Sequence, residues 1–79
     1  MPYFVYILRC KDKTLYTGIT NDLVKRLAAH RAGTGAKYTK SHPPDKIVYT
    51  EKCRGRSAAQ KREAAIKKLS RAEKIKLFQ

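Results

Sequence analysis

The fold is decided by three consecutive segments of the chain: FVYIL (residues 4–8), LYTGI (residues 15–19) and NDLVKRLAAH (residues 21–30). The first two are rich in β-branched and aromatic residues, which favour β-strands. The first is apolar on both of its alternating faces, as in a strand that is covered on both sides. A polar break at residues 11–13 has the length of a hairpin turn. We therefore predict a β-hairpin whose strands cover residues 3–9 and 15–19.

This hairpin would place two tyrosines on one face. A turn centred near Asp12 puts Leu8 opposite Tyr16 and Tyr6 opposite Gly18. The two phenols are then diagonal neighbours, within reach of each other. Gly18 has no side chain to fill the space opposite Tyr6, so a ligand or a backbone segment can approach there. We expect the two tyrosines to border a notch.

A helix is predicted after the hairpin. Thr20, Asn21 and Asp22 are all suitable N-cap residues. Gly33 is suited to the C′ position, where a left-handed backbone ends many helices. A helix of about eleven residues lies between these signals. Its apolar stripe would be formed by Leu23, Leu27 and Ala28.

Arg26 and His30 lie one helical turn apart at the edge of this stripe, because residues at i and i+4 are neighbours on a helix. An arginine that only solvates the surface would point away from the core. These two flank the surface that packs on the sheet, so both are candidate site residues. For His30 an alternative stays open, namely a histidine near the helix end that interacts with the helix dipole.

Residues 33–45, GTGAKYTKSHPPD, are predicted to form a loop because they contain glycines and a Pro-Pro pair. Tyr38 lies between Lys37 and Lys40, where its ring could stack on a nucleobase. The alternative is an exposed tyrosine that is simply amphipathic surface. We expect His42 to belong to the loop only.

The remaining segments complete the predicted fold. Residues 47–53 alternate well enough for a third strand, and their lysines favour an edge position. A capping box at residues 57–60 begins a helix that ends near Leu69, and a second at residues 70–73 begins a short terminal helix. The expected anchors of the longer helix are Ala59, Ile66 and Leu69. The class is α/β (α+β), with a small three-stranded antiparallel sheet flanked by helices.

Length and charge limit the class of protein. A chain of 79 residues is expected to form a single domain, residues 1–79, because it cannot enclose two independent cores. Its 19 lysines and arginines exceed its 6 acidic residues by 13, a balance that favours polyanions such as nucleic acid. The longest apolar run, residues 3–8, is far too short to span a bilayer. We expect no membrane partner.

The cysteines and histidines show no metal-binding pattern. Cys10 and Cys53 are too far apart for a CxxC motif, and His30 and His42 complete no zinc-finger spacing. We interpret the cysteines as buried thiols at strand ends. Their small number agrees with a reducing compartment, and residues 3–8 lack the flanking features of a signal peptide. A cytoplasmic location is therefore expected.

The spacing of five residues carries a family resemblance. Tyr6 and Tyr16 are followed by Arg26 and His30, and Glu63 lies on the later helix. Val5-Tyr6-Ile7 and Tyr16-Thr17-Gly18 stand at the places of the two signature triplets of the GIY-YIG nuclease superfamily, which the chain resembles over nearly its whole length. That superfamily includes the incision subunit of bacterial nucleotide-excision repair. In LYTGIT, GAKYT and the Lys-Arg-Glu-x-x-Ile-Lys segment, the chain is most similar to small stand-alone bacterial GIY-YIG proteins.

The resemblance implies the GIY-YIG endonuclease-like fold and phosphodiester hydrolysis with a single divalent ion, Mg²⁺ or Mn²⁺. Glu63 would be the only protein ligand to that metal, with waters and a substrate oxygen in the other positions. Arg26 would hold the scissile phosphate. Tyr6 would orient or deprotonate the attacking water, and Tyr16 would assist it or bind the phosphate. His30 is the alternative base, because its ordinary pKa suits work near neutral pH.

Cations of the loop and of the later helix are candidates for contacts with phosphates. The alternative is a solvated helical face, and for Glu63 it is an i,i+4 pair with Lys67. The predicted nucleic-acid-binding residues are Lys37, Tyr38, Lys40, Arg54, Arg56, Lys61, Arg62 and Lys67.

These observations predict a metal-dependent endonuclease that cleaves DNA, with RNA as the second candidate, in DNA repair or processing. The chain carries no separate DNA-reading domain, so we expect recognition of shape, ends or single strands, or targeting by a protein partner. No asparagine follows Glu63, although many catalytic members of the family carry one. That difference motivates an alternative, a non-catalytic DNA- or RNA-binding module with the same fold. A ribosome-associated or assembly protein is supported by charge alone, and the oligomeric state is left open.

Overall fold

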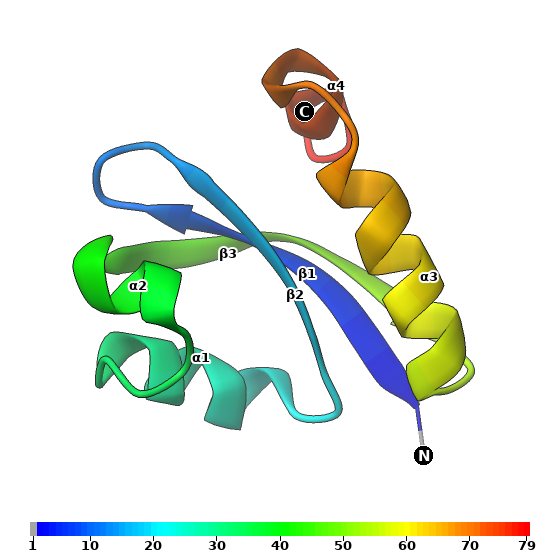
Figure 1. Ribbon diagram of the computed structural model, residues 1–79, viewed down its shortest axis with the longest axis horizontal. Coiled ribbons are helices and arrows are strands. Elements are labelled where there is room, and N and C mark those ends of the chain that lie inside the picture. Colours follow the sequence, from blue (N-terminus) through cyan, green and yellow to red (C-terminus); the bar gives the residue numbers. More distant parts are fainter. Residues whose placement is uncertain (1) are drawn as a thin grey trace.

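The computed structural model, which describes residues 2–79, is built around a central strand. This strand pairs antiparallel with one neighbour on each side, in the order β2-β1-β3. Figure 1 shows α1 and α2 together on the left of the sheet, with α3 and α4 on the right. The elements are β1 (Tyr3–Cys10), β2 (Leu15–Thr20), α1 (Leu23–Arg31), α2 (Lys37–Ser41), β3 (Pro44–Cys53), α3 (Arg56–Lys67) and α4 (Arg71–Lys76). The predicted class and the three-stranded antiparallel sheet are confirmed.

The hairpin formed by β1 and β2 has the predicted register. Asp12 stabilises its turn, because the carboxylate accepts hydrogen bonds from the Thr14 backbone N–H at 3.1 Å and the Thr14 hydroxyl at 2.6 Å. The predicted partners are confirmed, Leu8 with Tyr16 and Tyr6 with Gly18. Since side chains alternate along a strand, this register puts both tyrosines on one face.

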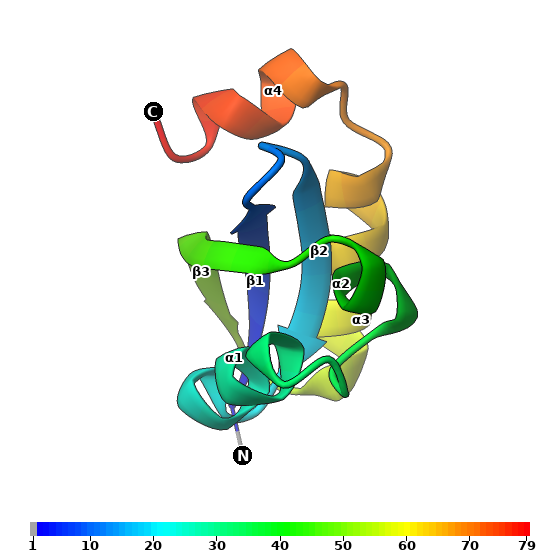
Figure 2. The same cartoon turned by 90° about the vertical axis from the view of Figure 1, so that its left-hand side faces the viewer.

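The two faces of β1 are covered by different helices. Val5 and Ile7 point toward α3, where they form the main hydrophobic core with Ala59 and Ile66, all with no exposed surface. Tyr6 points to the opposite face, toward α1, where its hydroxyl reaches His30. Figure 2 shows α1 and α2 in front of the strands, and α3 behind them next to β2. A strand covered on both faces was predicted for this segment, and the burial confirms it.

Local signals set the ends of α1 as expected. The N-cap is Asp22, whose side chain accepts a hydrogen bond from the Lys25 backbone N–H at 3.0 Å. Gly33 follows the helix with a left-handed φ of 79°. The predicted stripe is wrong at Ala28, which is exposed, whereas His30 is buried. Ala28 is five residues after Leu23 and so lies about 140° around the helix from it.

The loop predicted for residues 33–45 is wrong in two places. Residues 37–41 form α2, and β3 begins at Pro44 rather than at Ile47. A proline is compatible with the start of an edge strand, because its missing N–H removes no bond from the sheet. α2 has no side-chain N-cap bond but carries the buried Thr39, so packing rather than a local sequence signal stabilises it.

The ends of α3 also differ from the prediction. Its N-cap is Gly55 without a side-chain hydrogen bond, so the capping box at residues 57–60 does not form. The helix ends at Lys67 instead of Leu69. The second predicted capping box is confirmed, since Ser70 and Glu73 exchange hydrogen bonds of 3.0 and 3.2 Å at the start of α4.

Two further expectations concern cysteines and membranes. Cys10 is buried at the end of β1 and Cys53 is half-buried at the end of β3, and neither forms a disulfide. Within residues 2–79, no helix combines the length and the hydrophobicity needed to cross a bilayer.

Candidate active site

Three of the predicted site residues meet at the hydroxyl group of Tyr6. The Tyr6 Oη lies 2.7 Å from Nε2 of His30, and Nε of Arg26 donates a longer hydrogen bond to it at 3.4 Å. Tyr6 and His30 are each only 1% exposed. The hairpin supplies the phenol and α1 supplies the two basic groups, so a strand and the following helix build this cluster together.

The space beside Gly18 is already filled. A Cβ atom at Gly18 would lie 2.5 Å from the Tyr6 Oη and 3.1 Å from the Tyr16 ring. The predicted open notch is therefore wrong, because the Tyr6 ring itself occupies the volume that the glycine leaves free. A tyrosine is long enough to lie across the neighbouring strand, which strand pairing alone does not reveal.

Gly35, which precedes α2, and Thr39 on α2 contact the two basic groups. The Gly35 carbonyl accepts a hydrogen bond of 2.7 Å from Nη2 of Arg26. A Cβ atom at Gly35 would lie 2.6 Å from Nδ1 of His30, so only glycine allows this close approach. Thr39, 2% exposed, places its Oγ1 2.7 Å from the same Nδ1. This segment, predicted as a loop, thus holds the site together.

A column of aromatic rings leads outward from the cluster. Tyr16 is half-buried, and its ring lies 5.4 Å from that of His30 and 5.7 Å from that of Tyr38. Tyr38 in turn stacks on His42, with centroids 4.0 Å apart and an angle of 7°. Tyr38 and His42 are therefore parts of the same aromatic cluster as Tyr16, which corrects the expectation that His42 belongs to the loop only.

Glu63 lies on α3, the helix that packs against Val5 and Ile7 of β1. Its side chain is 22% exposed and forms an ion pair of 3.3 Å with Lys67. Within residues 2–79, no hydrogen bond joins it to the other four predicted site residues. Burial is the main cause of the raised pKa of Tyr6, and the charge of Glu63 makes the smallest contribution to it. The ion pair with Lys67 is the i,i+4 alternative that the sequence left open for Glu63, and the structure contains it.

Burial keeps the central pair neutral. Burial raises the pKa of Tyr6 above 10.0, although the hydrogen bond and the charge of Arg26 oppose this. Burial lowers the pKa of His30 below 6.5, and the nearby Arg26 charge lowers it further. A neutral phenol therefore faces a neutral imidazole near pH 7, as proton transfer between them requires.

Comparison with known proteins identifies the family of this chain. A family described as the GIY-YIG catalytic domain matches residues 2–76. The chain belongs to the GIY-YIG family. Members of this family are typically nucleases, generally use divalent metal ions and bind nucleic acid.

Relatives of this GIY-YIG domain align along nearly its whole length. UPF0213 protein CPE1444 of Clostridium perfringens is 54% identical over 75 residues, which cover 95% of this chain and 81% of the relative. A UPF0213 protein of Syntrophus aciditrophicus is 57% identical over 76 residues, covering 95% and 87%. The solution NMR structure of protein EF2693 from E. faecalis is 41% identical, with a TM-score of 0.64 and coverage of 98% of this chain and 83% of that one. That of UPF0213 protein BH0048 from Bacillus halodurans is 42% identical, with a TM-score of 0.60 and coverage of 98% and 82%.

The donor set of this GIY-YIG domain fits a hard divalent ion. Glu63 offers one carboxylate, and the lysine that pairs with it is 53% exposed and free to move away. A single carboxylate suits Mg²⁺ or Mn²⁺, which keep waters and substrate oxygens as further ligands. The described residues contain no group of three or more His, Cys, Asp or Glu that could hold a metal ion. The described residues therefore do not form a metal site in which protein side chains supply all the ligands.

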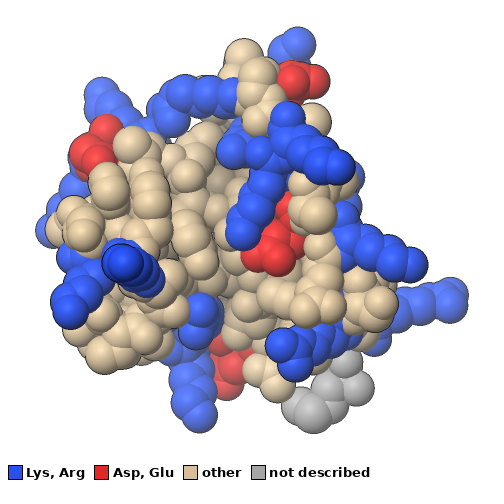
Figure 3. All heavy atoms as spheres, in the orientation of Figure 1, with Lys and Arg blue, Asp and Glu red and all other residues tan. Residues whose placement is uncertain are grey.

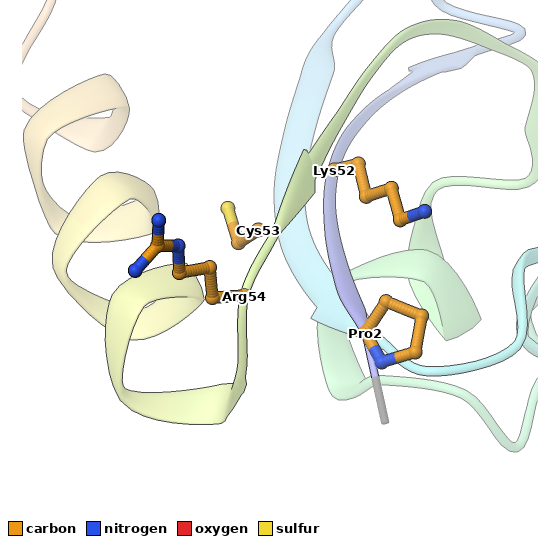
Figure 4. Close-up of a pocket in the computed structure, with 4 residues that line it drawn as sticks. All are labelled: Pro2, Lys52, Cys53 and Arg54. Carbon is orange, nitrogen blue, oxygen red and sulfur yellow. The ribbon is translucent and has the colours of Figure 1, made fainter.

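Arg26 is accessible from solvent on one side. A hollow of about 270 Å³ is lined by Thr20, Asn21, Asp22, Lys25, Arg26 and Ala29. Another hollow of about 440 Å³, lined by Pro2, Lys52, Cys53 and Arg54, lies where β1 begins and β3 ends (Figure 4). Figure 4 shows Lys52 and Arg54 extending to opposite sides of β3, so their charges do not converge on one point there. Of the two hollows, only the first contains a predicted catalytic residue.

The predicted nucleic-acid-binding residues are dispersed over the surface. Figure 3 shows lysine and arginine side chains around the whole outline of the molecule, with few acidic groups between them. Arg62 is engaged by Glu51, whose carboxylate accepts bonds of 2.9 and 3.2 Å from its Nε. Tyr38 is half-buried, and the exposed residues of the set are Lys37, Lys40, Arg54, Arg56, Lys61 and Lys67.

Sequence reasoning missed Gly35 and Thr39 as parts of the site. The only sequence features that point to this segment are the two glycines at 33 and 35 and a threonine within the predicted loop. Nothing local indicates that this threonine meets a histidine nine residues earlier.

Proposed function

We propose that this protein is a metal-dependent endonuclease that hydrolyses phosphodiester bonds of DNA, selected by structure rather than by sequence, in DNA repair or processing. The observation that carries the proposal is the contact of Arg26 and His30 with one buried phenol, in a member of the GIY-YIG family. This contact provides a fixed cation beside a group that can exchange a proton. Both are needed to break a phosphodiester bond.

Arg26 is proposed to hold the scissile phosphate. Its guanidinium has five N–H donors, of which one binds Tyr6 and one binds Gly35. The other donors are available for phosphate oxygens, and the hollow along α1 gives access to them. Because Gly35 holds the planar group in place, little side-chain entropy is lost when the phosphate binds. Arg26 can then offset the charge that builds on the phosphate in the transition state.

Tyr6 and Tyr16 are proposed to act on the attacking water and the phosphate. The Tyr6 hydroxyl accepts a hydrogen bond from Nε of Arg26 and shares another with Nε2 of His30, and we propose that a remaining lone pair of its oxygen orients a water. Tyr16 is less buried and stacks against the aromatic column, so it can reach a phosphate oxygen or assist Tyr6. His30 is buried behind Tyr6, and we propose that it acts through Tyr6 rather than on the water.

Glu63 is proposed to hold the divalent ion. When bound, that ion would supply Lewis-acid activation of the phosphate and of a coordinated water. For the site to assemble, the carboxylate must leave Lys67 and turn toward the hydroxyl of Tyr6.

A cleavage assay with matched variants tests the proposal. Purified protein is incubated with supercoiled plasmid and with branched or single-stranded DNA, with and without Mg²⁺ or Mn²⁺. We expect metal-dependent nicking that Glu63→Ala abolishes. Glu73→Gln serves as control, because Glu73 only caps α4. Nicking no greater than that of Glu63→Ala would refute the proposal.

A second candidate function is a nucleic-acid-binding module without efficient chemistry. It is favoured by the near-complete burial of Tyr6 and by the pairing of Glu63 with Lys67. This candidate predicts salt-dependent binding of DNA or RNA that survives Arg26→Ala and Glu63→Ala. If these substitutions abolish binding, the second candidate is wrong.

A further inference from the structure

The side chain of Thr39 is placed to control His30. It projects inward from α2, is 2% exposed, and has two polar neighbours. Its Oγ1 lies 2.7 Å from Nδ1 of His30 and 3.2 Å from the carbonyl oxygen of Ala36. A hydroxyl has one proton to donate, whereas a carbonyl can only accept. If the Thr39 proton points to Ala36, Nδ1 of His30 must carry a proton and donate it to Oγ1.

The hydrogen bonds of Tyr6 select the same arrangement. If His30 carried its proton on Nε2 instead, the Tyr6 oxygen would accept bonds from both Nε2 and Arg26 Nε. The phenolic proton would then have no acceptor among the residues that the structure describes. An unpaired polar hydrogen is costly in a side chain that is only 1% exposed. With the proton on Nδ1, each hydrogen bond in the series from Arg26 through Tyr6, His30 and Thr39 to the Ala36 carbonyl has one donor and one acceptor.

We propose that Thr39 is a positioning residue that holds His30 in the Nδ1-protonated tautomer, so that Nε2 accepts the phenolic proton of Tyr6. The inference rests on the proposed function and deepens it at the same site. In the reaction, the O–H bond of Tyr6 breaks and an N–H bond forms at Nε2. This step produces a phenolate beside the Arg26 guanidinium and an imidazolium whose Nδ1–H is held by Thr39. The charge on Arg26 stabilises the first of these products.

Serine is the residue that can replace Thr39 in this function. Valine has nearly the shape of threonine but offers no oxygen to the imidazole. Thr34 provides a matched control in the same segment, because its hydroxyl donates to the Ala29 carbonyl at 3.2 Å and is exposed. Thr39→Val, Thr39→Ser and Thr34→Val therefore separate the hydrogen bond to His30 from the general effect of losing a threonine.

The tautomer can be read without nucleic acid or metal. We expect the imidazole ¹⁵N spectrum of the wild-type chain, labelled at histidine, to show His30 protonated on Nδ1 and unprotonated on Nε2 near pH 7.5. A His30→Gln variant assigns the signals. A wild-type His30 protonated on Nε2 would overturn the proposal, and this measurement needs no folded variant of Thr39.

The variants then test the cause. We expect Thr39→Val to shift the His30 signals toward the Nε2-protonated form and to lower kcat for nicking by about 10²-fold, the lower range of a positioned proton-transfer group. KM for DNA should change little. Thr39→Ser and Thr34→Val should keep both the wild-type signals and rate. Unchanged His30 signals in Thr39→Val would overturn the proposal. If the signals shift as expected but wild-type protein does not nick DNA, the nuclease proposal fails and the positioning of His30 by Thr39 stands.

Discussion

The imidazole of His30 makes the stability of the protein depend on pH. Burial and the charge of Arg26 lower its pKa below the ordinary 6.5. The unfolded chain therefore binds a proton more readily than the folded one, and this contribution to stability is present above about pH 6.5 and is lost as the pH falls below it. We expect the thermal midpoint to decrease from pH 7 to pH 5 by circular dichroism.

His30→Gln should remove this part of the pH dependence. Three carboxyl groups also have lowered pKa values, because hydrogen bonds from Thr14, Arg9 and Ser70 stabilise the charged forms of Asp12, Asp45 and Glu73. Their contributions are lost only near pH 4 and below. A decrease between pH 7 and 5 that persists in His30→Gln would contradict the assignment to His30.

Arg26 provides a second prediction for a single residue. Lysine at this position keeps the charge but lacks the planar set of donors that binds Tyr6 and Gly35 together. We expect Arg26→Lys to lower kcat for nicking about 10²- to 10³-fold, as for loss of a donor that stabilises transition-state charge. Arg31→Lys is the control on the same helix, since Arg31 donates its hydrogen bond to the Asp45 carbonyl, at 3.2 Å, and not to the site. Equal activity of Arg26→Lys and wild type would contradict this function of Arg26.

Among the elements, α2 has the most unexpected contribution. It carries Thr39 toward His30 and Tyr38 onto Tyr16, so a helix of only five residues supports two sides of the site. A helix this short is not stable by itself. Its contacts with α1 and with the tyrosine of β2 stabilise it, which explains why its sequence shows a loop pattern.

The approach of this segment to α1 depends on Gly35. A Cβ atom there would lie 2.6 Å from the His30 Nδ1 and 2.8 Å from the His30 backbone nitrogen. We expect Gly35→Ala to lower the free energy of unfolding by about 1–3 kcal/mol, the usual cost of overpacking, as measured by urea denaturation.

Gly55 is a matched control for this change. A Cβ atom at Gly55 would meet no atom within 4 Å, and its φ of −167° is open to any residue. We expect Gly55→Ala to be neutral within about 0.5 kcal/mol. If Gly35→Ala and Gly55→Ala lower the free energy of unfolding by the same amount, the close contact with His30 is not the reason that residue 35 is a glycine.

For the whole molecule, the dominant property is the excess of positive charge. The net charge is +13, and the acidic groups that form ion pairs with lysine or arginine are Asp45, Glu51 and Glu63. Most cations are therefore free to interact with phosphates. The wide distribution of charge in Figure 3 favours binding to the backbone of nucleic acid over the reading of a particular base sequence.

This charge predicts a steep salt dependence. Three or more phosphate contacts would lower affinity for a short DNA duplex by at least about 10-fold between 50 and 200 mM salt. We expect Lys37→Ala with Lys40→Ala to reduce the slope of log affinity against log salt, as measured by fluorescence anisotropy. Arg62→Gln should change the slope less, because Glu51 already binds Arg62. An affinity independent of salt would contradict the prediction.

The fold was largely predictable because its signals are local. β-Branched and aromatic residues identified the two hairpin strands, alternation identified the third strand, and the short polar turn set the register that pairs Tyr6 with Gly18. Caps and a terminal glycine located α1, and helical spacing placed Arg26 and His30 beside the sheet. Of the two predicted capping boxes, the one at Ser70 forms and the one at residues 57–60 does not. A capping box forms only where the chain enters the helix at that residue, and this depends on the preceding strand.

By itself, therefore, the sequence determined the hairpin, its register, the face shared by the tyrosines and the positions of Arg26 and His30 on α1. Each follows from the side-chain periodicity of a strand or helix, or from a helix-capping residue, and these depend on only a few neighbouring residues. Only the tertiary structure decided that Tyr6 fills the space at Gly18 and that Gly35 and Thr39 hold His30. These contacts depend on side-chain volumes and hydrogen-bond directions between different elements of the fold, which become defined only when the helices pack on the sheet and on each other.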